Sequence, residues 1–331
     1  MPLTEEFLKI TYFCRNYFFM RKAYAQLNIA VFLWGFTGIL GKAIHLAAPI
    51  LVWWRMFLAS LILFVLLKLG RKFVKIVKKD YYKLFLVGVL FAIHWVFFYY
   101  SVKWANASVA MICMATSSVL ASILEPIIRK RPLVLSEFLL GLIALLGVVC
   151  IYFFPGEAKD ASTEIPHFEK GVLVGVLAAM VNAFFSILNK PLAEKYPAQL
   201  LVFYEMTSGW VVLLFFLLFS GFSITENLGY IPNGIDWLWL GILVYFCTVI
   251  AQSLATAALQ KLSAFTVTLS VNLEPVYGIF LAFIFFNENE QLGNGFYLGL
   301  IIIFLSLLGQ LYFSTQKSRR NVPKSPLRKR I

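Results

Sequence analysis

The chain has 331 residues, of which 61% are apolar, 17% aromatic and only 14% charged. This composition excludes a soluble globular protein and is typical of an integral membrane protein. The formal net charge of +13 comes mainly from basic residues between the apolar runs, so we interpret it as a topology signal with attraction to anionic lipids, and not as nucleic-acid binding.

Ten apolar runs are long enough to cross a bilayer, which requires about 20 helical residues each. We therefore predict an all-α polytopic membrane protein with ten transmembrane helices and no soluble domain. No cleavable signal peptide is evident, because Lys9 and Arg15 interrupt the first apolar stretch. The predicted spans are 24–45, 48–69, 82–103, 106–128, 134–154, 170–190, 197–220, 236–258, 264–286 and 294–314.

Basic residues gather on alternate loops. One side carries the cluster from Lys68 to Lys83 and the tail from Lys317 to Arg330, whereas the segment 155–169 on the other side has four acidic residues and one lysine. By the positive-inside rule we predict that both termini are cytoplasmic, that 155–169 is external and that the membrane is the plasma (inner) membrane.

Residues 1–23 mix aromatic and basic side chains, which is typical of a helix that lies on a membrane surface. We predict a cytoplasmic segment of this kind. Met20 is an alternative start of the chain, so translation of residues 1–19 is left open.

The first span places Gly35, Gly38 and Gly41 three residues apart, next to Trp34. A helix face with so few side chains favours close approach of a neighbouring helix. Trp34 suits packing and the aromatic wall of a substrate cavity equally well. Lys42, near the outer end of this span, is predicted to reach water.

Arg55 lies about 9 Å inside the second span by helix rise, and a guanidinium at that depth needs hydrogen-bond acceptors. The third span carries His94, Trp95 and Tyr99, which are candidates for the wall of a cavity.

Further polar residues recur along one face of later spans. In the fourth span, Glu125 lies near the basic residues 129–131, so a structural ion pair is its expected role. Stripes in the second half either line a shared wet interior or make hydrogen bonds between helices. These stripes are Asn182, Ser186 and Asn189 in span six and Thr248, Gln252 and Thr256 in span eight.

The ninth span places Glu274 near the membrane midplane, where a charge costs about 2.5–3.5 kcal/mol and must face protein or water. Pro275 follows it and is expected to bend the helix beside the acid, and Asn272 precedes it. Ionisable residues at this depth usually mark a functional site, so Glu274 is predicted to bind a proton or an amine. The alternative is a packing acid that is hydrogen-bonded inside the bundle.

The two halves of the chain echo each other. GKAIHLAAP at 41–49 resembles NKPLAEKYP at 189–197, and GLIALLGVVCIYF at 141–153 resembles GLIIIFLSLLGQLYF at 299–313. Five spans in each half is an odd number, so the second half must cross the membrane in the opposite sense. The symmetry gives Arg55 and Glu205 corresponding places, and we predict that each stabilises the other's charge, directly or through a polar group.

The predicted organisation has five parts. They are a cytoplasmic N-terminal segment (1–23), a first five-helix repeat (24–154), an external linker (155–169), a second five-helix repeat (170–314) and a basic cytoplasmic tail (315–331).

Several residues carry a resemblance to a known family. They are Leu33-Trp34-Gly35 followed by Lys42, then Arg55, and Pro275 to Asn287-Glu288 followed by Gly299. With these residues the chain resembles EamA-type members of the drug/metabolite transporter superfamily over 24–314. The first repeat departs from the pattern, with Ser118 in place of a proline and Arg131 in place of a terminal glutamate.

The resemblance implies an exporter of amino acids and other small metabolites, with spans 1–4 and 6–9 around a central cavity and spans 5 and 10 outside it. We therefore predict a secondary transporter that works by alternating access, with proton coupling and exchange both left open. A sugar-phosphate or nucleotide-sugar exchanger is the alternative within transport, although Arg55 is nearly the only basic residue of the predicted cavity.

Other classes fit less well. G-x-x-x-x-G-K-[ST], H-E-x-x-H and G-x-S-x-G are all missing from the sequence, which argues against ATP coupling within this chain and against an intramembrane enzyme. A lipid-handling scaffold is left open. The four cysteines and three histidines have no metal-ligand spacing, so we expect neither metal nor cofactor.

The expected partners are a small-molecule substrate and membrane lipids, with no nucleic acid and with a homodimer left open. The candidate substrate-binding residues are Trp34, His94, Trp95, Tyr99, Asn182, Ser186, Gln252, Thr256 and Asn272, and the candidate coupling or charge-pair residues are Glu274, Arg55 and Glu205.

Overall fold

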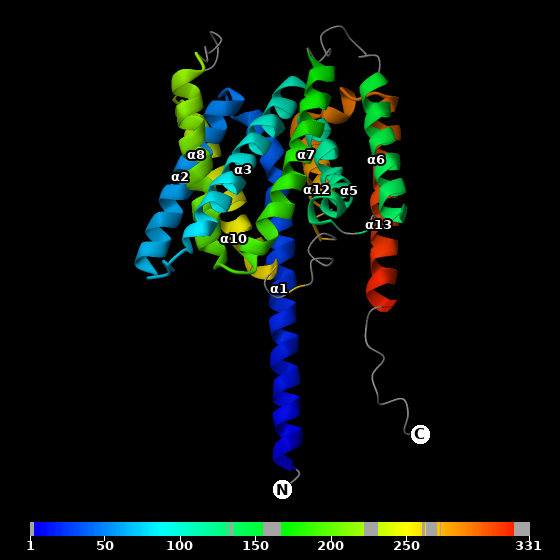
Figure 1. Ribbon diagram of the computed structural model, residues 1–331. Helices are drawn as coiled ribbons and strands as arrows, with labels where there is room; N and C mark the ends of the chain where they lie inside the picture. Colours follow the sequence, from blue (N-terminus) through cyan, green and yellow to red (C-terminus); the bar gives the residue numbers. More distant parts are fainter. Residues whose placement is uncertain are drawn as a thin grey trace.

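The structure is a computed structural model that describes residues 3–130, 132, 135–154, 167–221, 231–259, 262, 270–271 and 273–320, with side chains described between Lys22 and Phe313 except those of residues 118, 137, 259, 310 and 311. Within these ranges the chain forms a bundle of helices (Figure 1). The first half contains α1 (Leu3–Ala43), α2 (Ala48–Leu69), α3 (Lys78–Trp104), α4 (Ala107–Ala115), α5 (Ser117–Arg129) and α6 (Leu135–Phe153).

The second half has more interruptions among its described residues. It contains α7 (Phe168–Ala193), α8 (Ala198–Phe219), α9 (Gly234–Val244), the π-helix η2 (Tyr245–Ile250), α10 (Ala251–Leu259), α12 (Glu274–Phe286), the short 3₁₀-helix η3 (Glu288–Glu290) and α13 (Asn294–Arg320).

The described residues contain six continuous stretches that are long and apolar enough to cross a membrane, and one further span, α4 with α5, that bends by 42°. Shorter apolar helices lie in α6, α12 and α13. These elements fall where the sequence predicts spans, so the predicted all-α multi-span fold is confirmed. The bounds of α2 agree to the residue, because Pro49 starts the helix and Gly70 ends it.

The two halves cross the bundle in opposite senses. α7 begins at the face opposite to the one from which α1 enters, and α13 ends on the same side as α1 begins (Figure 1). We call the face where α1 enters and α13 ends the terminal face, and the other the opposite face. In such an inverted arrangement, the second half repeats the first half upside down in the membrane.

The helices α6 and α13 form a pair at one edge of the bundle (Figure 1). Their backbones approach closely, since a Cβ atom added at Gly147 would lie 2.9 Å from the Gly299 carbonyl oxygen. This placement agrees with the expectation that spans five and ten lie outside the central group of helices. The other helices are then left to form the site.

The prediction for the N-terminal segment needs correction. The structure has one continuous helix of 41 residues from Leu3 to Ala43, so residues 3–23 extend the axis of the first span and do not turn to lie along a surface (Figure 1). The reason is local, because the chain has neither glycine nor proline between Leu3 and Trp34 to end the helix.

The prediction for Pro275 is also wrong in detail. Pro275 does not bend a continuing helix, because α12 begins at Glu274 and Pro275 lies in its first turn. A proline there loses no helical hydrogen bond, since the first N–H groups of a helix have no partner within it. Glu274 is therefore the first residue of a helix, and most of the predicted span before it lies outside the described residues.

The closest described contact between α3 and α8 depends on Gly88. A Cβ atom at this position would lie 2.6 Å from Ser208 Cβ and 2.7 Å from the Glu205 carbonyl oxygen. Overpacking of this kind costs about 1–3 kcal/mol. We expect Gly88→Ala to lower the melting temperature of the detergent-solubilised protein, measured by size-exclusion chromatography after heating.

Gly241→Ala is the matched control. Gly241 also lies inside a helix, but a Cβ atom there would have nothing within 4 Å, so its replacement should keep or slightly raise stability. Equal losses in the two variants would show that the α3–α8 contact has no such dependence.

Candidate functional site

The most deeply buried cation among the described residues is Arg55 on α2, which is only 1% exposed. Its Nε donates to Thr248 Oγ1 at 2.8 Å, and its Nη1 donates to the Tyr99 hydroxyl at 2.8 Å. A guanidinium is always charged, so these oxygens replace part of the hydration that it loses on burial.

Aromatic rings of α3 complete the surroundings of Arg55. Its guanidinium carbon lies 3.6 Å from the centre of the Trp95 ring, within the range of a cation–π interaction. Trp95 and Tyr99 are stacked with ring centres 5.8 Å apart. Tyr99 in turn packs flat on Gly41 of α1, where any side chain would collide with its ring. The glycine thus makes room for one of the two hydrogen-bond partners of Arg55.

Thr248 belongs to the π-helix η2, in which the backbone is wound more loosely than in an α-helix. Its hydroxyl donates to the Leu243 carbonyl oxygen at 2.9 Å, five residues earlier, and accepts from Arg55. Short π-helical turns are frequent at functional sites. The sequence places Thr248, Gln252 and Thr256 in one polar stripe of span eight. Nothing in that stripe indicates which of the three residues binds Arg55.

Arg55 has no part in the ion pairs formed among the described residues. Glu274 is within electrostatic reach of it and is half-buried at the start of α12, without a hydrogen bond in this part of the chain. The N-terminal end of a helix carries a partial positive charge that favours a carboxylate. The structure therefore places a cation and an acid in one region without joining them.

Arg55 and Glu205 are not brought together. Glu205 is also buried, at 1% exposure, but it accepts a hydrogen bond from Asn189 Nδ2 at 2.7 Å. Its backbone lies against Gly88, whereas Arg55 contacts Trp95 and Tyr99 farther along the same helix. That difference in register corresponds to about 10–16 Å along the helix axis. Arg55 and Glu205 therefore do not make the direct contact that the sequence predicted as one possibility.

The remaining candidates of spans three and six lie between helices. His94 is buried, and its Nδ1 donates to the Ala178 carbonyl oxygen of α7 at 3.1 Å. Asn182 donates to Ser117 Oγ on α5 at 2.9 Å, so it links α7 to α5. Ser186 is exposed. The hydrogen bonds of His94 and Asn182 join helices. The sequence left this role open for such polar residues, beside the lining of a wet interior.

The candidates of spans one and eight share a second region. Trp34 is half-buried and packs against Ala251 and Ala255 of α10, which also carries Gln252 and Thr256. The Thr256 hydroxyl donates to the backbone oxygen of Gln252 at 2.8 Å. Asn272 lies outside the described residues.

A carboxylate joins three helices at the opposite face. Glu288 is fully buried and accepts hydrogen bonds from the backbone nitrogens of Ala107 and Ser108 at 3.0 and 2.8 Å and from Ser108 Oγ at 2.6 Å. It also pairs with Lys42 Nζ at 2.7 Å. Lys42 therefore does more than reach water: its side chain is 26% exposed, and it also has a buried partner, Glu288, from a distant part of the sequence.

The Glu288 contact joins α1, α4 and the end of α12 at the opposite face. Ala107 and Ser108 are the first two residues of α4, so the carboxylate binds free N–H groups and the positive end of the helix. His45 strengthens the same face, with its backbone nitrogen and its ring Nδ1 at 3.1 and 3.2 Å from Asp236 Oδ1.

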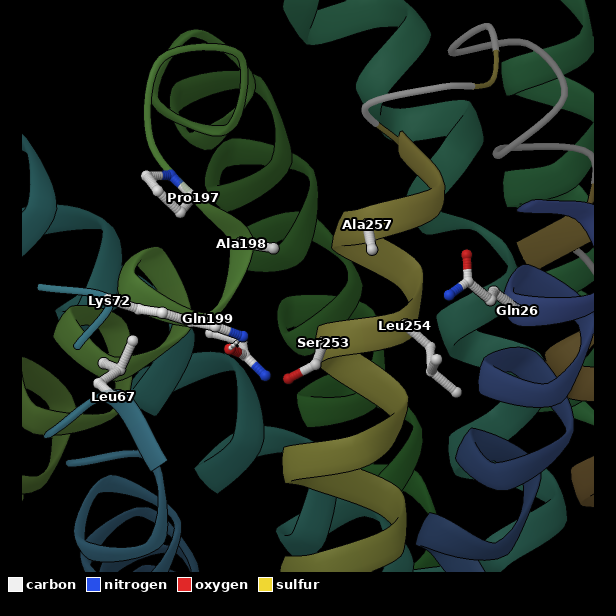
Figure 2. Close-up of a pocket in the computed structure, with 9 residues that line it drawn as sticks. All are labelled: Gln26, Leu67, Lys72, Pro197, Ala198, Gln199, Ser253, Leu254 and Ala257. Carbon is white, nitrogen blue, oxygen red and sulfur yellow. Dashed lines mark hydrogen bonds between the residues drawn. The ribbon is translucent and has the colours of Figure 1, made fainter. Parts of the chain in front are cut away.

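The terminal face instead has a cavity of about 450 Å³. α10 forms its back wall with Ser253 and Leu254, the loop residue Lys72 and the start of α8 with Gln199 form one side, and Gln26 of α1 lies on the other (Figure 2). None of the predicted site residues lines it. The sequence pattern missed Gln26 and Ser253 because single polar residues near a span end are equally typical of solvated helix ends.

The loop before α8 is fixed beside this cavity. Lys195 pairs with Asp80 at the start of α3, and this hydrogen bond raises the pKa of the Lys195 ammonium group. The Tyr196 hydroxyl donates to the same carboxylate at 2.6 Å. Asp80 is therefore fully engaged and does not face the cavity.

Comparison with known proteins identifies the family of this chain. The model of the EamA-like transporter family matches the chain twice, over residues 21–153 and 169–312, one match for each half. The chain belongs to the EamA-like transporter family. It is a multi-pass membrane transporter and not an enzyme.

Two bacterial relatives and one solved structure are similar to this EamA-like chain. It is 25% identical over 273 residues to an uncharacterized transporter, YetK, of Bacillus subtilis (strain 168), a match that covers 80% of each chain. It is 24% identical over 211 residues to YdfC of the same organism, covering 63% of this chain and 65% of YdfC.

The solved structure, described only as a protein crystal structure, has a TM-score of 0.58 at 15% identity. It covers 89% of this chain and 98% of its own. At this identity the likeness concerns the fold alone.

Two double-mutant cycles test the arrangement around Arg55. Arg55→Leu combined with Tyr99→Phe should show a coupling of about 0.5–3 kcal/mol, because the two side chains share a buried hydrogen bond. Arg55→Leu combined with Glu205→Leu should be additive within about 0.5 kcal/mol, since groups this far apart act independently. Unfolding in detergent at increasing denaturant measures both. Strong coupling in the second cycle would restore the predicted link between Arg55 and Glu205.

Proposed function

We propose that the chain is a secondary active transporter that exports small metabolites such as amino acids by alternating access around a cavity near the midplane. The observation that carries this proposal is the match of the EamA-like family to both inverted halves. Inverted repeats are how many secondary transporters build one site that faces either side in turn.

The terminal face is the cytoplasmic face of the plasma membrane in this proposal. The basic residues of the loop from Lys68 to Lys83 lie there, together with the end of α13, as the positive-inside rule requires. A cysteine at Lys75 should then be labelled by impermeant reagents only from the cytoplasmic side, and a cysteine at Ser220 only from outside.

The state of the two faces fits loading of an exporter. Glu288 closes the opposite face, whereas the terminal face has a cavity. A substrate that leaves the cell has to be taken up from the cytoplasmic side first. The described arrangement therefore corresponds to the loading state, and release follows after the Glu288 contacts separate.

Recognition takes place deeper in the bundle, between Arg55 and Glu274. The guanidinium of Arg55 has unused N–H donors beyond its bonds to Thr248 and Tyr99, and these suit a carboxylate. Glu274 suits a substrate amine or a proton, because a carboxylate at mid-membrane needs a cation beside it. Trp95 and Tyr99 form the wall beside Arg55 in this proposal, and Trp34, Gln252 and Thr256 form a neighbouring wall.

Metabolite profiling tests the transport class before any substrate has been identified. We expect one or a few small polar metabolites to accumulate in the medium when the intact chain is overproduced. Counterflow of the labelled compound in proteoliposomes then has to show exchange. A profile that equals that of the Arg55→Leu variant at equal membrane abundance would contradict the proposal.

Glu274→Gln tests the coupling. The amide keeps the size of the side chain and imitates the protonated acid, so the protein should fold and still exchange substrate across proteoliposomes. Accumulation driven by a pH gradient should fall to the level seen without a gradient, because the variant cannot bind and release a proton there. Glu290→Gln is the control, since Glu290 is an exposed acid of the following loop. Undiminished accumulation by Glu274→Gln would make the acid structural.

A further inference from the structure

We infer that the cavity at the terminal face is the loading site of the transporter and that it prefers solutes whose polar group is negatively charged, such as a carboxylate. This assignment rests on the proposed transport function and adds the sign of the charge that is selected. The cavity lies apart from Arg55, at the point where a solute leaves water and enters the bundle.

One side of the cavity offers hydrogen-bond donors. Lys72 Nζ lies 3.4 Å from Gln199 Oε1, so two of its three N–H donors are free of that contact (Figure 2). The N-terminus of α8 adds to this positive potential, because Ala198 and Gln199 are its first residues and Pro197, at the N-cap, gives no side-chain cap.

Two buried polar atoms of the lining have no partner. Ser253 Oγ on α10 and Gln26 Oε1 on α1 are both buried without a hydrogen bond among the described residues. Ser253 points toward Gln199, on the side that carries Lys72 (Figure 2). Buried polar groups normally have partners, so the hydroxyl beside the cavity is available to a solute or an ordered water inside it.

The lining has no negative charge to oppose an anion. Lys72 is its only charged residue. The two described acids closest in sequence to the start of α8 do not line the cavity. Glu205 is bound to Asn189, and Glu194 is exposed in the preceding loop and does not line the cavity. The remaining wall, with Leu254 and Ala257, is apolar. A small solute with an anionic head and a short apolar part matches this combination.

The expected selectivity can be measured while the substrate is still unidentified. Ala257→Cys, in a chain whose four native cysteines are replaced by alanine, places a thiol on the apolar wall. Inside-out vesicles are treated with anionic sulfonatoethyl methanethiosulfonate or with cationic trimethylammonioethyl methanethiosulfonate. We expect the anion-to-cation ratio of labelling rates, relative to that of a free thiol, to be raised about tenfold.

Replacing Lys72 separates the cavity from the general field of the basic loop. Lys72→Gln should lower the ratio at least threefold, whereas Lys75→Gln removes an equal charge from the same loop without touching the cavity and should leave the ratio unchanged. Ser253→Cys provides a second labelling position if Ala257→Cys folds poorly.

Faster labelling by the cation, or equal effects of Lys72→Gln and Lys75→Gln, would overturn the inference. Labelling does not depend on transport. If labelling shows the expected preference for the anion but no metabolite is exported, the proposed transport function is refuted. The charge preference of the cavity is then still supported.

Discussion

The buried charge of Arg55 is the constraint on which the rest of the structure depends. A guanidinium cannot lose its charge in a protein, and burial without partners would cost many kcal/mol. The fold meets this demand from three helices. α3 brings Trp95 and Tyr99, η2 brings Thr248, and α1 leaves space for Tyr99 at Gly41. The partners are an aromatic face and two hydroxyl groups, so the positive charge is solvated but not neutralised.

A cation without a bound carboxylate is well suited to a transport site. A permanent ion pair would fill the donors of Arg55 and hold the helices in one arrangement. Here the acid in the same region, Glu274, is the first residue of α12. In the proposed mechanism, substrate and proton alter the balance between the two groups without first breaking a strong bond.

The two faces of the bundle are held by unequal contacts. Glu288, at the end of span nine, joins α12 to α4 and to Lys42 at the opposite face. The first repeat has Arg131 at the position where its own glutamate would stand, and Arg131 lies outside the described residues. Its neighbour Arg129 pairs with Glu125 at 3.4 Å and donates to the Ile187 carbonyl oxygen, and Asp80 binds Lys195 and Tyr196 at the same face. The two faces are therefore held by different carboxylates.

The sequence was sufficient for the fold because span length and apolar content follow from the thickness of the bilayer alone. The odd number of spans per half then dictated the inversion, and the ion pair of Glu125 followed from residues four apart on one helix. The site was harder to predict. Lys42 and Glu288, or Arg55 and Thr248, are far apart in the chain, and nothing local distinguishes them from other polar residues at similar depth. Pro275 was misread because a proline in an apolar run is equally compatible with a bend and with a new helix start.

The central claim is that closure of the opposite face and opening of the terminal face are two ends of one motion. Distances between spin labels measure this directly, with one pair at Ser220 and Gln291 on the opposite face and one at Tyr24 and Lys75 on the terminal face. In Glu288→Gln, which weakens the pairing with Lys42 and with the start of α4, the first distance should lengthen and the second should shorten together. A change at the opposite face with no change at the terminal face would contradict alternating access in this protein.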